Sequence, residues 1–214
     1  MFEKLPEALG QALREQRAGL DKIVFNQLKL HGGTATLQVS SLAFADHAPI
    51  PAVYTADGNG ISPPIEWTGI PAAGASLILI VEDADSPTPQ PLVHAIVADL
   101  PAEDGSLAEG AIAKDSVISD EATIGRNSFL QAGWLPPDPP PGHGVHRYAF
   151  QLFALSDGPG FSSTPGREAV MQMLQERAIA SGILVGTYER SDGSIRISRQ
   201  EGAGMVGPSG LAGP

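Results

Sequence analysis

The chain has 214 residues, 24 acidic and 13 basic, and its formal net charge is −11. No cluster of Lys and Arg offers the basic face that nucleic acid requires, so nucleic acid is excluded as a partner. The acidity also disfavours binding to anionic bilayers. The absence of cysteine excludes disulfides, thiol catalysis and thiolate metal sites.

One packed domain with many turns is expected, because 42% of the residues are hydrophobic and the chain holds 25 Gly and 19 Pro. The segment Met1–Leu5 is charged and lacks the apolar core of a signal peptide. No apolar run reaches the about 18 residues of a membrane-spanning helix. We therefore expect a cytoplasmic protein without a transmembrane segment.

Residues 1–33 are predicted to form an N-terminal helical extension. Four leucines fall near one helical face, at Leu5, Leu9, Leu13 and Leu20. The pair Gly32-Gly33 ends the pattern. Two interpretations stay open: the helix packs on its own domain, which we favour, or it forms a homodimer through an exposed leucine stripe.

Residues 34–200 alternate short apolar runs with turn residues, which is typical of a β domain. The run 76–81 is continuously apolar and predicts a central strand that is buried on both faces. Further strands are expected at 36–39, 93–98, 148–155 and 183–188. Within 93–98, His94 shares a side with Ile96 and Ala98, so it faces protein or a pocket and not open solvent.

One longer helix is predicted between these last two strands. Thr164 suits the N-cap and Pro165 the first helical position, and Gly182 is expected to end the helix. An apolar stripe runs between them at Val170, Met171, Leu174 and Ala178. The tail 201–214 is rich in Gly, Ser and Pro and is predicted to be disordered.

Polar side chains gather at the loop–strand junctions of this uncharged β core, at Asp83, Asp85, His94, His146 and Tyr148. Taken singly, each has a structural explanation: the aspartates can bond backbone N–H groups of a turn, and the histidines can be buried core residues. As a set they indicate one small polar pocket, provided that the two loops lie side by side.

Several motifs together resemble the phosphatidylethanolamine-binding protein family, also called the Raf-kinase-inhibitor-like family. They are Tyr54–Gly58 with Ser62–Trp67, Glu82–Pro87 with His94, and Gly133–Gly142 with His146–Tyr148. The ending Leu184–Arg190 resembles the bacterial and archaeal branch of the family. The resemblance runs from about residue 34 to residue 190 and rests on the joint match of the motifs.

This resemblance implies a mainly β fold with a large central sheet, a second smaller sheet and a few peripheral helices. It also implies an anion-binding pocket at one end of the sheet. Carried over residue by residue, the pocket comprises Asp83, Asp85, Pro87, His94, His146 and Tyr148, with the loop of Pro139 as a wall.

The sequence departs from the family pattern at Leu92, Trp134, Pro136 and Asp138. Leu92 stands where an aromatic residue is frequent, and Trp134 where a tyrosine is usual. Pro136 replaces a usual glycine. A charged Asp138 facing the pocket would repel phosphate, which weakens the expectation of anion binding.

The predicted function is the binding of a small anion or a phosphorylated headgroup, with a regulatory role like that of a kinase inhibitor and without turnover. The alternative is an enzyme that uses the His/Asp pocket for general acid/base chemistry on a small phosphorylated or carbonyl compound. A partner protein is implied by analogy of fold alone. No cofactor is predicted and no metal, since the spacing of the His and Asp residues matches no compact metal motif.

A phosphate beside carboxylates is tolerable if an aspartate is protonated or if His94 or His146 is cationic. We therefore predict that anion binding strengthens as the pH falls from about 8 towards about 6, the range in which histidine gains its charge.

Overall fold

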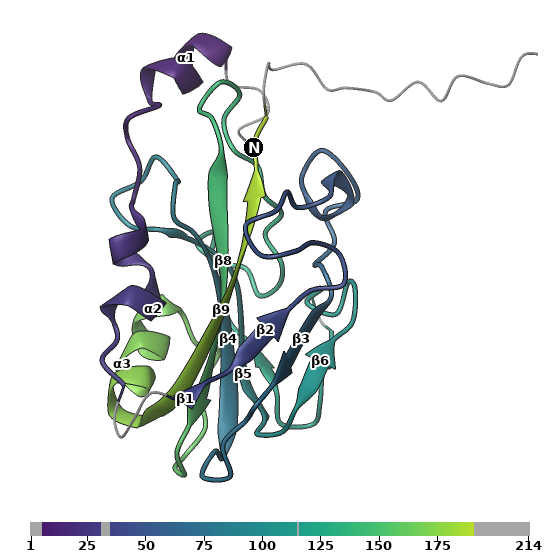
Figure 1. The fold of residues 1–214 in the computed structure, drawn as a ribbon, viewed down its shortest axis with the longest axis vertical. Coiled ribbons are helices and arrows are strands. Elements are labelled where there is room, and N and C mark those ends of the chain that lie inside the picture. Colours follow the sequence, from purple (N-terminus) through teal and green to yellow (C-terminus); the bar gives the residue numbers. More distant parts are fainter. Residues whose placement is uncertain (1–5, 31–34, 115, 191–214) are drawn as a thin grey trace, which may run out of the picture.

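The computed structural model describes residues 6–30, 35–114 and 116–190 (Figure 1). In this part of the chain the helices are α1 (Glu7–Ala12), the 3-10 turn η2 (Leu20–Lys22), α2 (Val24–Gln27), the 3-10 turn η3 (Ala52–Tyr54) and α3 (Arg167–Arg177). The strands are β1 (Ala35–Thr36), β2 (Gln38–Ser40), β3 (Ile65–Thr68), β4 (Ser76–Asp83), β5 (Leu92–Pro101), β6 (Gly105–Leu107), β7 (Thr123–Ile124), β8 (His146–Leu155) and β9 (Ala178–Tyr188).

The strands of the described residues form two sheets. The larger has six strands in the order β1-β9-β8-β4-β5-β7, and the smaller has three in the order β2-β3-β6. The pair β1–β9 is parallel, and the other pairs are antiparallel. The prediction of a mainly β fold with one large and one smaller sheet is confirmed.

Strand β4 lies inside the larger sheet, and both of its faces are covered. Leu77 and Leu79 point into the core cluster that also contains Trp67 of the smaller sheet. Ile78 and Ile80 point the other way, into a cluster with Leu174 of α3 and other apolar residues. Since alternate residues of a strand face opposite sides, the continuous apolar run is explained by this double burial, as predicted.

A buried carboxylate ties the N-terminal segment to this second face. Glu82, at the end of β4, is fully buried. It accepts hydrogen bonds from the backbone N–H of Val24 at 2.7 Å, from Arg167 Nε at 2.7 Å and from Gln151 Nε2 at 2.9 Å. The guanidinium and the two further donors compensate the cost of burying the charge, and they hold α2 and α3 against the sheet.

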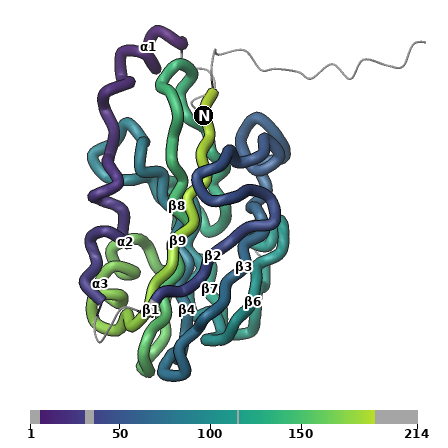
Figure 2. The backbone as a smooth tube through the Cα atoms, viewed as in Figure 1, coloured from purple at the N-terminus to yellow at the C-terminus, as the bar shows by residue number. Residues whose placement is uncertain are grey.

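The N-terminal segment differs from the predicted single leucine face. It runs down one side of the molecule as α1, η2 and α2, which are short and separate (Figure 2). Helix formation stops between them because the N–H groups of Ala18 and Gly19 bond the carbonyl oxygens of Ser86 and Ala84. Ile23 and Val24 are fully buried, so part of this segment packs on its own domain. Homodimerisation stays a prediction.

The predicted boundary between the last helix and the last strand is wrong. Helix α3 begins after the N-cap Gly166, not at Thr164, and β9 already begins at Ala178. The ladder from His146↔Tyr188 to Leu155↔Ala178 satisfies the backbone of this segment, so Gly182 lies within β9. A Cβ at Gly182 would collide with the backbone of Leu37, which explains the glycine by close packing. The predicted tail 201–214 lies outside the described residues, as do residues 1–5 and 31–34.

Candidate functional site

A cavity of about 450 Å³ opens where β4 and β5 meet the proline-rich loop 135–145 that precedes β8. Its walls come from segments far apart in the sequence: Ala56, Asp83, Ser86, Pro87, Leu92, His94, Phe129, Gln131, Leu135, Pro136, Asp138, Pro139, Pro140 and His146. Of the seven residues predicted to bind a ligand, the structure places Asp83, Pro87, His94, Pro139 and His146 in this lining.

Asp83, His94, His146 and Tyr148 form the buried polar group that we call the floor, and none of them is more than 4% exposed. Asp83 and Tyr148 are direct partners in the β4–β8 ladder, so their side chains lie on one face of the sheet. The rings of His94 and Tyr148 meet edge to face at 5.1 Å between centroids. The expected convergence of the two motifs follows from the pairing of β4 with both β5 and β8.

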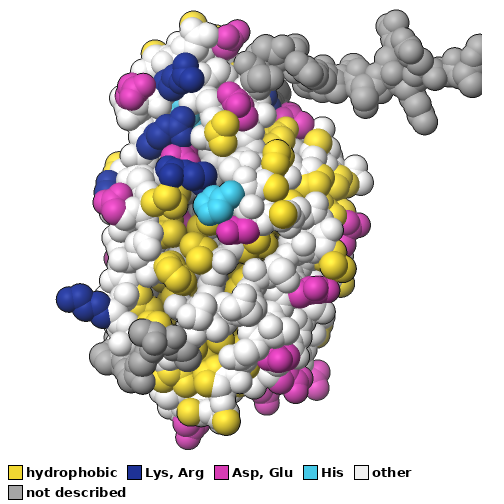
Figure 3. Space-filling view, viewed as in Figure 1, with side chains coloured by type: hydrophobic (Ala, Val, Ile, Leu, Met, Phe, Trp, Pro, Cys, Tyr) yellow, Lys and Arg dark blue, Asp and Glu magenta, His cyan; other side chains and the backbone are white. Residues whose placement is uncertain are grey.

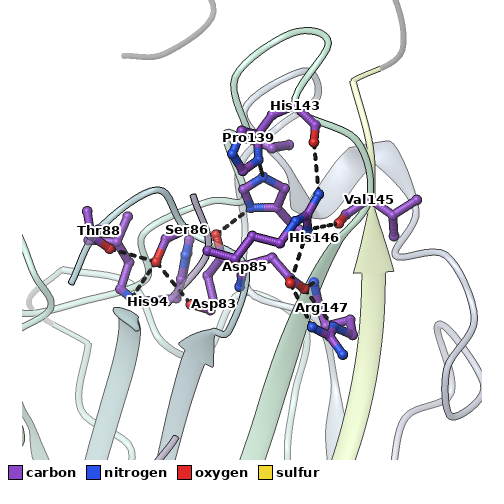
Figure 4. A network of polar contacts seen from close by, with 12 residues as sticks. Asp83, Asp85, Ser86, Thr88, His94, Pro139, His143, Val145, His146 and Arg147 are labelled. Atoms are coloured by element: carbon purple, nitrogen blue, oxygen red, sulfur yellow. Dashed lines mark hydrogen bonds and ion pairs between the residues drawn. The ribbon is translucent and has the colours of Figure 1, made fainter. Parts of the chain in front are cut away.

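Three side chains of this region form a hydrogen-bonded chain that we call the relay: Asp83, His146 and His143 (Figure 4). Asp83 Oδ2 lies 2.8 Å from His146 Nδ1, and His146 Nε2 lies 2.7 Å from His143 Nδ1. His143 Nε2 lies 2.8 Å from the carbonyl oxygen of Leu13, which follows α1. The relay therefore connects the cavity to the N-terminal segment.

The positions of the protons follow from counting them. The carbonyl of Leu13 can only accept, so His143 donates from Nε2. Burial and the neighbouring His146 lower the pKa of His143, which favours its neutral ring, and in that form its Nδ1 accepts. His146 then donates from Nε2, and a further proton lies between its Nδ1 and Asp83. Three hydrogen bonds hold three protons, and the relay has no net charge.

Asp85 points away from the cavity. It forms a two-pronged ion pair with Arg147, at 2.7 Å for both contacts, and lies 3.0 Å from Arg17. Burial opposes ionisation, but the hydrogen bonds from these guanidiniums outweigh it and lower the pKa of Asp85. Asp85 is absent from the cavity lining, and its backbone contact is the N–H of Arg147 in β8, at 2.9 Å.

Burial disfavours the cationic form of His94 that the sequence allowed. Its Nδ1 lies 2.6 Å from the carbonyl oxygen of Leu135 and must donate to it. Burial lowers the pKa of His94, which favours the neutral ring, in which Nε2 presents a lone pair. That Nε2 and the hydroxyl of Tyr148 are buried without a hydrogen-bond partner among the described residues. Tyr148 itself is not in the lining and forms the rear of the floor.

Asp138 does line the cavity, but its charge has a counterion. Arg190 Nη1 donates to Asp138 at 2.8 Å and to the carbonyl of Pro139 at 3.1 Å, and its Nη2 lies 2.6 Å from Asp57. The repulsion expected from Asp138 is thus reduced by a guanidinium directly behind it. Pro136 also contributes to the lining, as does Leu92, whereas Trp134 lies outside it and packs beside His94 at 6.1 Å between ring centroids.

The sequence interpretation missed His143 and the Asp57–Arg190 pair. Asp57 and Arg190 stand in the quoted motifs Tyr54–Gly58 and Leu184–Arg190, so their place in a motif could have singled them out. His143 lies between two glycines in a segment without any pattern of its own. The apolar rim residues Phe129 and Leu135 likewise carried no chemical signal.

Within the described ranges, no group of three His, Cys, Asp or Glu side chains is arranged to hold a metal ion. In the same part of the chain, no helix has the length and apolar character to cross a membrane.

Comparison with known proteins places this chain in a family. Residues 40–189 match the family model for phosphatidylethanolamine-binding protein. The chain is 34% identical over 172 residues to a UPF0098 protein of the bacterium Aquifex aeolicus, with 80% of this chain and 99% of the relative covered. It is 32% identical over 154 residues to a UPF0098 protein of the archaeon Methanothermobacter thermautotrophicus, with 72% and 99% covered.

Two solved structures share the fold. A phosphatidylethanolamine-binding protein homologue from Chlamydia trachomatis is 34% identical, with a TM-score of 0.65, and the match covers 73% of this chain and 99% of that one. YbcL of E. coli, described as a member of the mammalian PEBP family, is 28% identical, with a TM-score of 0.67 and coverage of 72% and 98%. The chain belongs to the phosphatidylethanolamine-binding protein family, in its bacterial and archaeal branch, as its motifs predicted.

Proposed function

We propose that the chain binds a small oxyanion or a phosphorylated headgroup in the cavity above the floor, as a ligand-binding protein with a regulatory role. One observation carries this proposal: His94 Nε2, in the cavity lining, and the Tyr148 hydroxyl, behind the lining, are buried and have no partner among the described residues. A buried polar atom without a partner costs about 1–3 kcal/mol, so a ligand that bonds both atoms gains that free energy on binding.

The size and polarity of the cavity fit a small head with an apolar continuation. Its volume of about 450 Å³ lies within the range of small-molecule sites. The polar floor is covered by a rim in which Leu92, Phe129 and Leu135 are only partly buried. A polar head on the floor and an apolar group against this rim would satisfy both surfaces.

The regulatory role is a proposal by analogy with the family, whose alternative name refers to kinase inhibition. Ligand binding would act on a partner protein through the exposed parts of the loops that form the cavity, at Pro89, Gln90 and Val145. A pull-down with the ligand present and absent tests it, and equal recovery of every bound protein would contradict regulation by the ligand.

General acid/base catalysis is the second candidate, and the relay is the observation that favours it. In this hypothesis the hydrogen-bonded pair Asp83–His146 exchanges a proton with a compound that is bound against it. Incubation of the protein with phosphate monoesters, followed by ³¹P NMR over hours, distinguishes turnover from binding. A constant monoester signal excludes turnover of these compounds, and the titration below tests their binding.

Isothermal titration with phosphate, O-phosphorylethanolamine and acetate tests the proposed binding. His94→Phe and Tyr148→Phe should each weaken binding by about 10-fold, the equivalent of one lost hydrogen bond of about 1.4 kcal/mol. His47→Ala is the matched control, because His47 is an exposed histidine outside the cavity. Absence of binding by all three compounds would overturn the proposal.

A further inference from the structure

We propose that the cavity selects a ligand that donates a hydrogen bond from its acidic group, so that a hydrogen-bearing phosphoryl group binds where sulfate does not. This inference rests on the proposed function and adds the protonation state of the ligand to it. It follows from the hydrogen-bonding capacity that the floor has left after its own contacts are made.

The first step concerns His94. Its Nδ1–H is committed to the carbonyl oxygen of Leu135 at 2.6 Å, so the other ring nitrogen of the neutral imidazole can only accept. This Nε2 is buried, and His94 lines the cavity. A ligand that reaches Nε2 must therefore bring a hydrogen atom.

The second step concerns the relay, which has no N–H left for a ligand. His146 uses Nε2 toward His143 and Nδ1 toward Asp83, and His143 uses Nε2 toward Leu13. Asp83 also accepts the backbone N–H of Asp85 at 2.8 Å. Asp83 has acceptor capacity left over, since each carboxylate oxygen holds two lone pairs.

The third step concerns charge. Among the described residues that line the cavity there is no Lys or Arg. Arg190 reaches this region through Asp138 and the carbonyl of Pro139, and its other contacts go to Asp57. The remaining buried donor is the hydroxyl of Tyr148, whose pKa burial, Asp83 and Asp138 raise well above its ordinary value, so it keeps its proton.

The floor thus offers one buried donor beside the acceptors His94 and Asp83. A sulfate would place oxygen lone pairs against both acceptors and add two negative charges beside Asp83. A phosphoryl group with one P–OH donates to one acceptor and receives the hydrogen bond of Tyr148. The P–OH group also distinguishes two esters of the same shape: the monoanion of methyl phosphate carries it, whereas methyl sulfate has no hydrogen on oxygen.

The groups that face this ligand all enter its pH dependence. In the lining they are Asp83 on β4, His94 on β5, His146 on β8 and Asp138 on the proline-rich loop. Behind it, Tyr148, His143 and Arg190 contact or neighbour these groups. The second proton of a phosphate monoester leaves near pH about 6, so binding of methyl phosphate should weaken as the pH rises from about 5.5 to about 8. Methyl sulfate has no proton to lose in this range.

The test is isothermal titration of the full chain with methyl phosphate, methyl sulfate and O-phosphorylethanolamine at several pH values. At pH about 6, methyl phosphate should bind at least 10-fold more tightly than methyl sulfate, as expected for a loss of about 1.4 kcal/mol. His94→Phe should remove most of this preference, whereas the exposed-site control His47→Ala should keep it. The comparison of the two esters on the unaltered protein does not depend on the folding of any variant.

Three outcomes overturn the inference in distinguishable ways. Equal affinity for methyl phosphate and methyl sulfate overturns the donor requirement and leaves the proposed function standing. Binding of none of the three compounds overturns the donor requirement together with the proposed function. An affinity for methyl phosphate that rises with pH also contradicts the inference, because the dianion lacks the donated hydrogen.

Discussion

The absence of a side chain at Gly10 lets α1 lie against the proline-rich loop. The substitution Gly10→Ala tests how strongly this contact stabilises the cavity. Gly10 is the buried residue of α1. A Cβ there would lie well under 3.0 Å from the carbonyl oxygen of Pro141 and 3.2 Å from the backbone nitrogen of His143. Because both neighbours are backbone atoms, α1 or the loop must move to admit a methyl group.

Two opposite effects determine the free energy of unfolding of Gly10→Ala. In a free helix, alanine is more stable than glycine by about 1 kcal/mol. The clash costs about 1–3 kcal/mol, as for other overpacked sites. Displacement of α1 also weakens the hydrogen bond from His143 to Leu13, which adds about 1 kcal/mol. The clash and the lost bond exceed the gain in propensity, and we expect a net loss of about 1–3 kcal/mol.

Urea denaturation measures this loss, and titration with methyl phosphate measures its effect on the cavity. Gly166→Ala is the matched control, because a Cβ there meets nothing within 4 Å. The control should lose no more than about 1 kcal/mol, the preference of an N-cap for glycine over alanine, and should bind as the unaltered protein does. A Gly10→Ala variant as stable as the unaltered protein, with unchanged affinity, would refute the reasoning.

Three further predictions concern charge. Since burial lowers the pKa of His94, this histidine gains its proton in the unfolded chain before it does so in the folded protein as the pH falls. The free energy of unfolding should therefore decline below pH about 6.5. Urea denaturation at pH 7.5 and pH 5.5 should show a smaller decline for His94→Phe than for the unaltered protein. Asp85→Asn weakens the ion pairs with Arg147 and Arg17, whose side chains are partly exposed. The free energy of unfolding should fall by about 1–3 kcal/mol, and an unchanged midpoint of thermal unfolding would contradict this. Arg190→Met removes a cation beside Asp138 and should weaken anion binding by about 10-fold in titration; unaltered affinity would show that this charge does not reach the ligand.

The central strand and the meeting of the two motifs could be predicted because they depend on local pattern and on pairing. A continuous apolar run at 76–81 has few options other than a strand that is covered on both faces. Once β4 pairs with β5 and β8, the residues at the ends of these strands are adjacent. The proximity of Asp83, His94 and His146 can therefore be predicted from the sequence with little further information.

Side-chain direction after a strand end could not be predicted in the same way. Asp83 belongs to β4, but Asp85 lies in the turn that follows, where the alternation of a strand no longer applies. Its direction is set by Arg17 and Arg147, which stand far away in the sequence. The boundary between α3 and β9 depends in the same way on the ladder with β8, which overrides the signals of Thr164 and Gly182.

The N-terminal segment contacts both of the loops that surround the cavity. The family match begins at residue 40, whereas Arg17, which precedes it, donates to the carbonyls of His143 and Val145 and pairs with Asp85. Basic side chains gather on the upper part of the face in Figure 3, beside this segment. Because both cavity loops are held by residues before the match, chains with the same pocket motifs and different N-terminal segments should place the relay histidines differently. The motifs supply the floor, and the segment before them holds the loops around it together with Arg147 and Arg190.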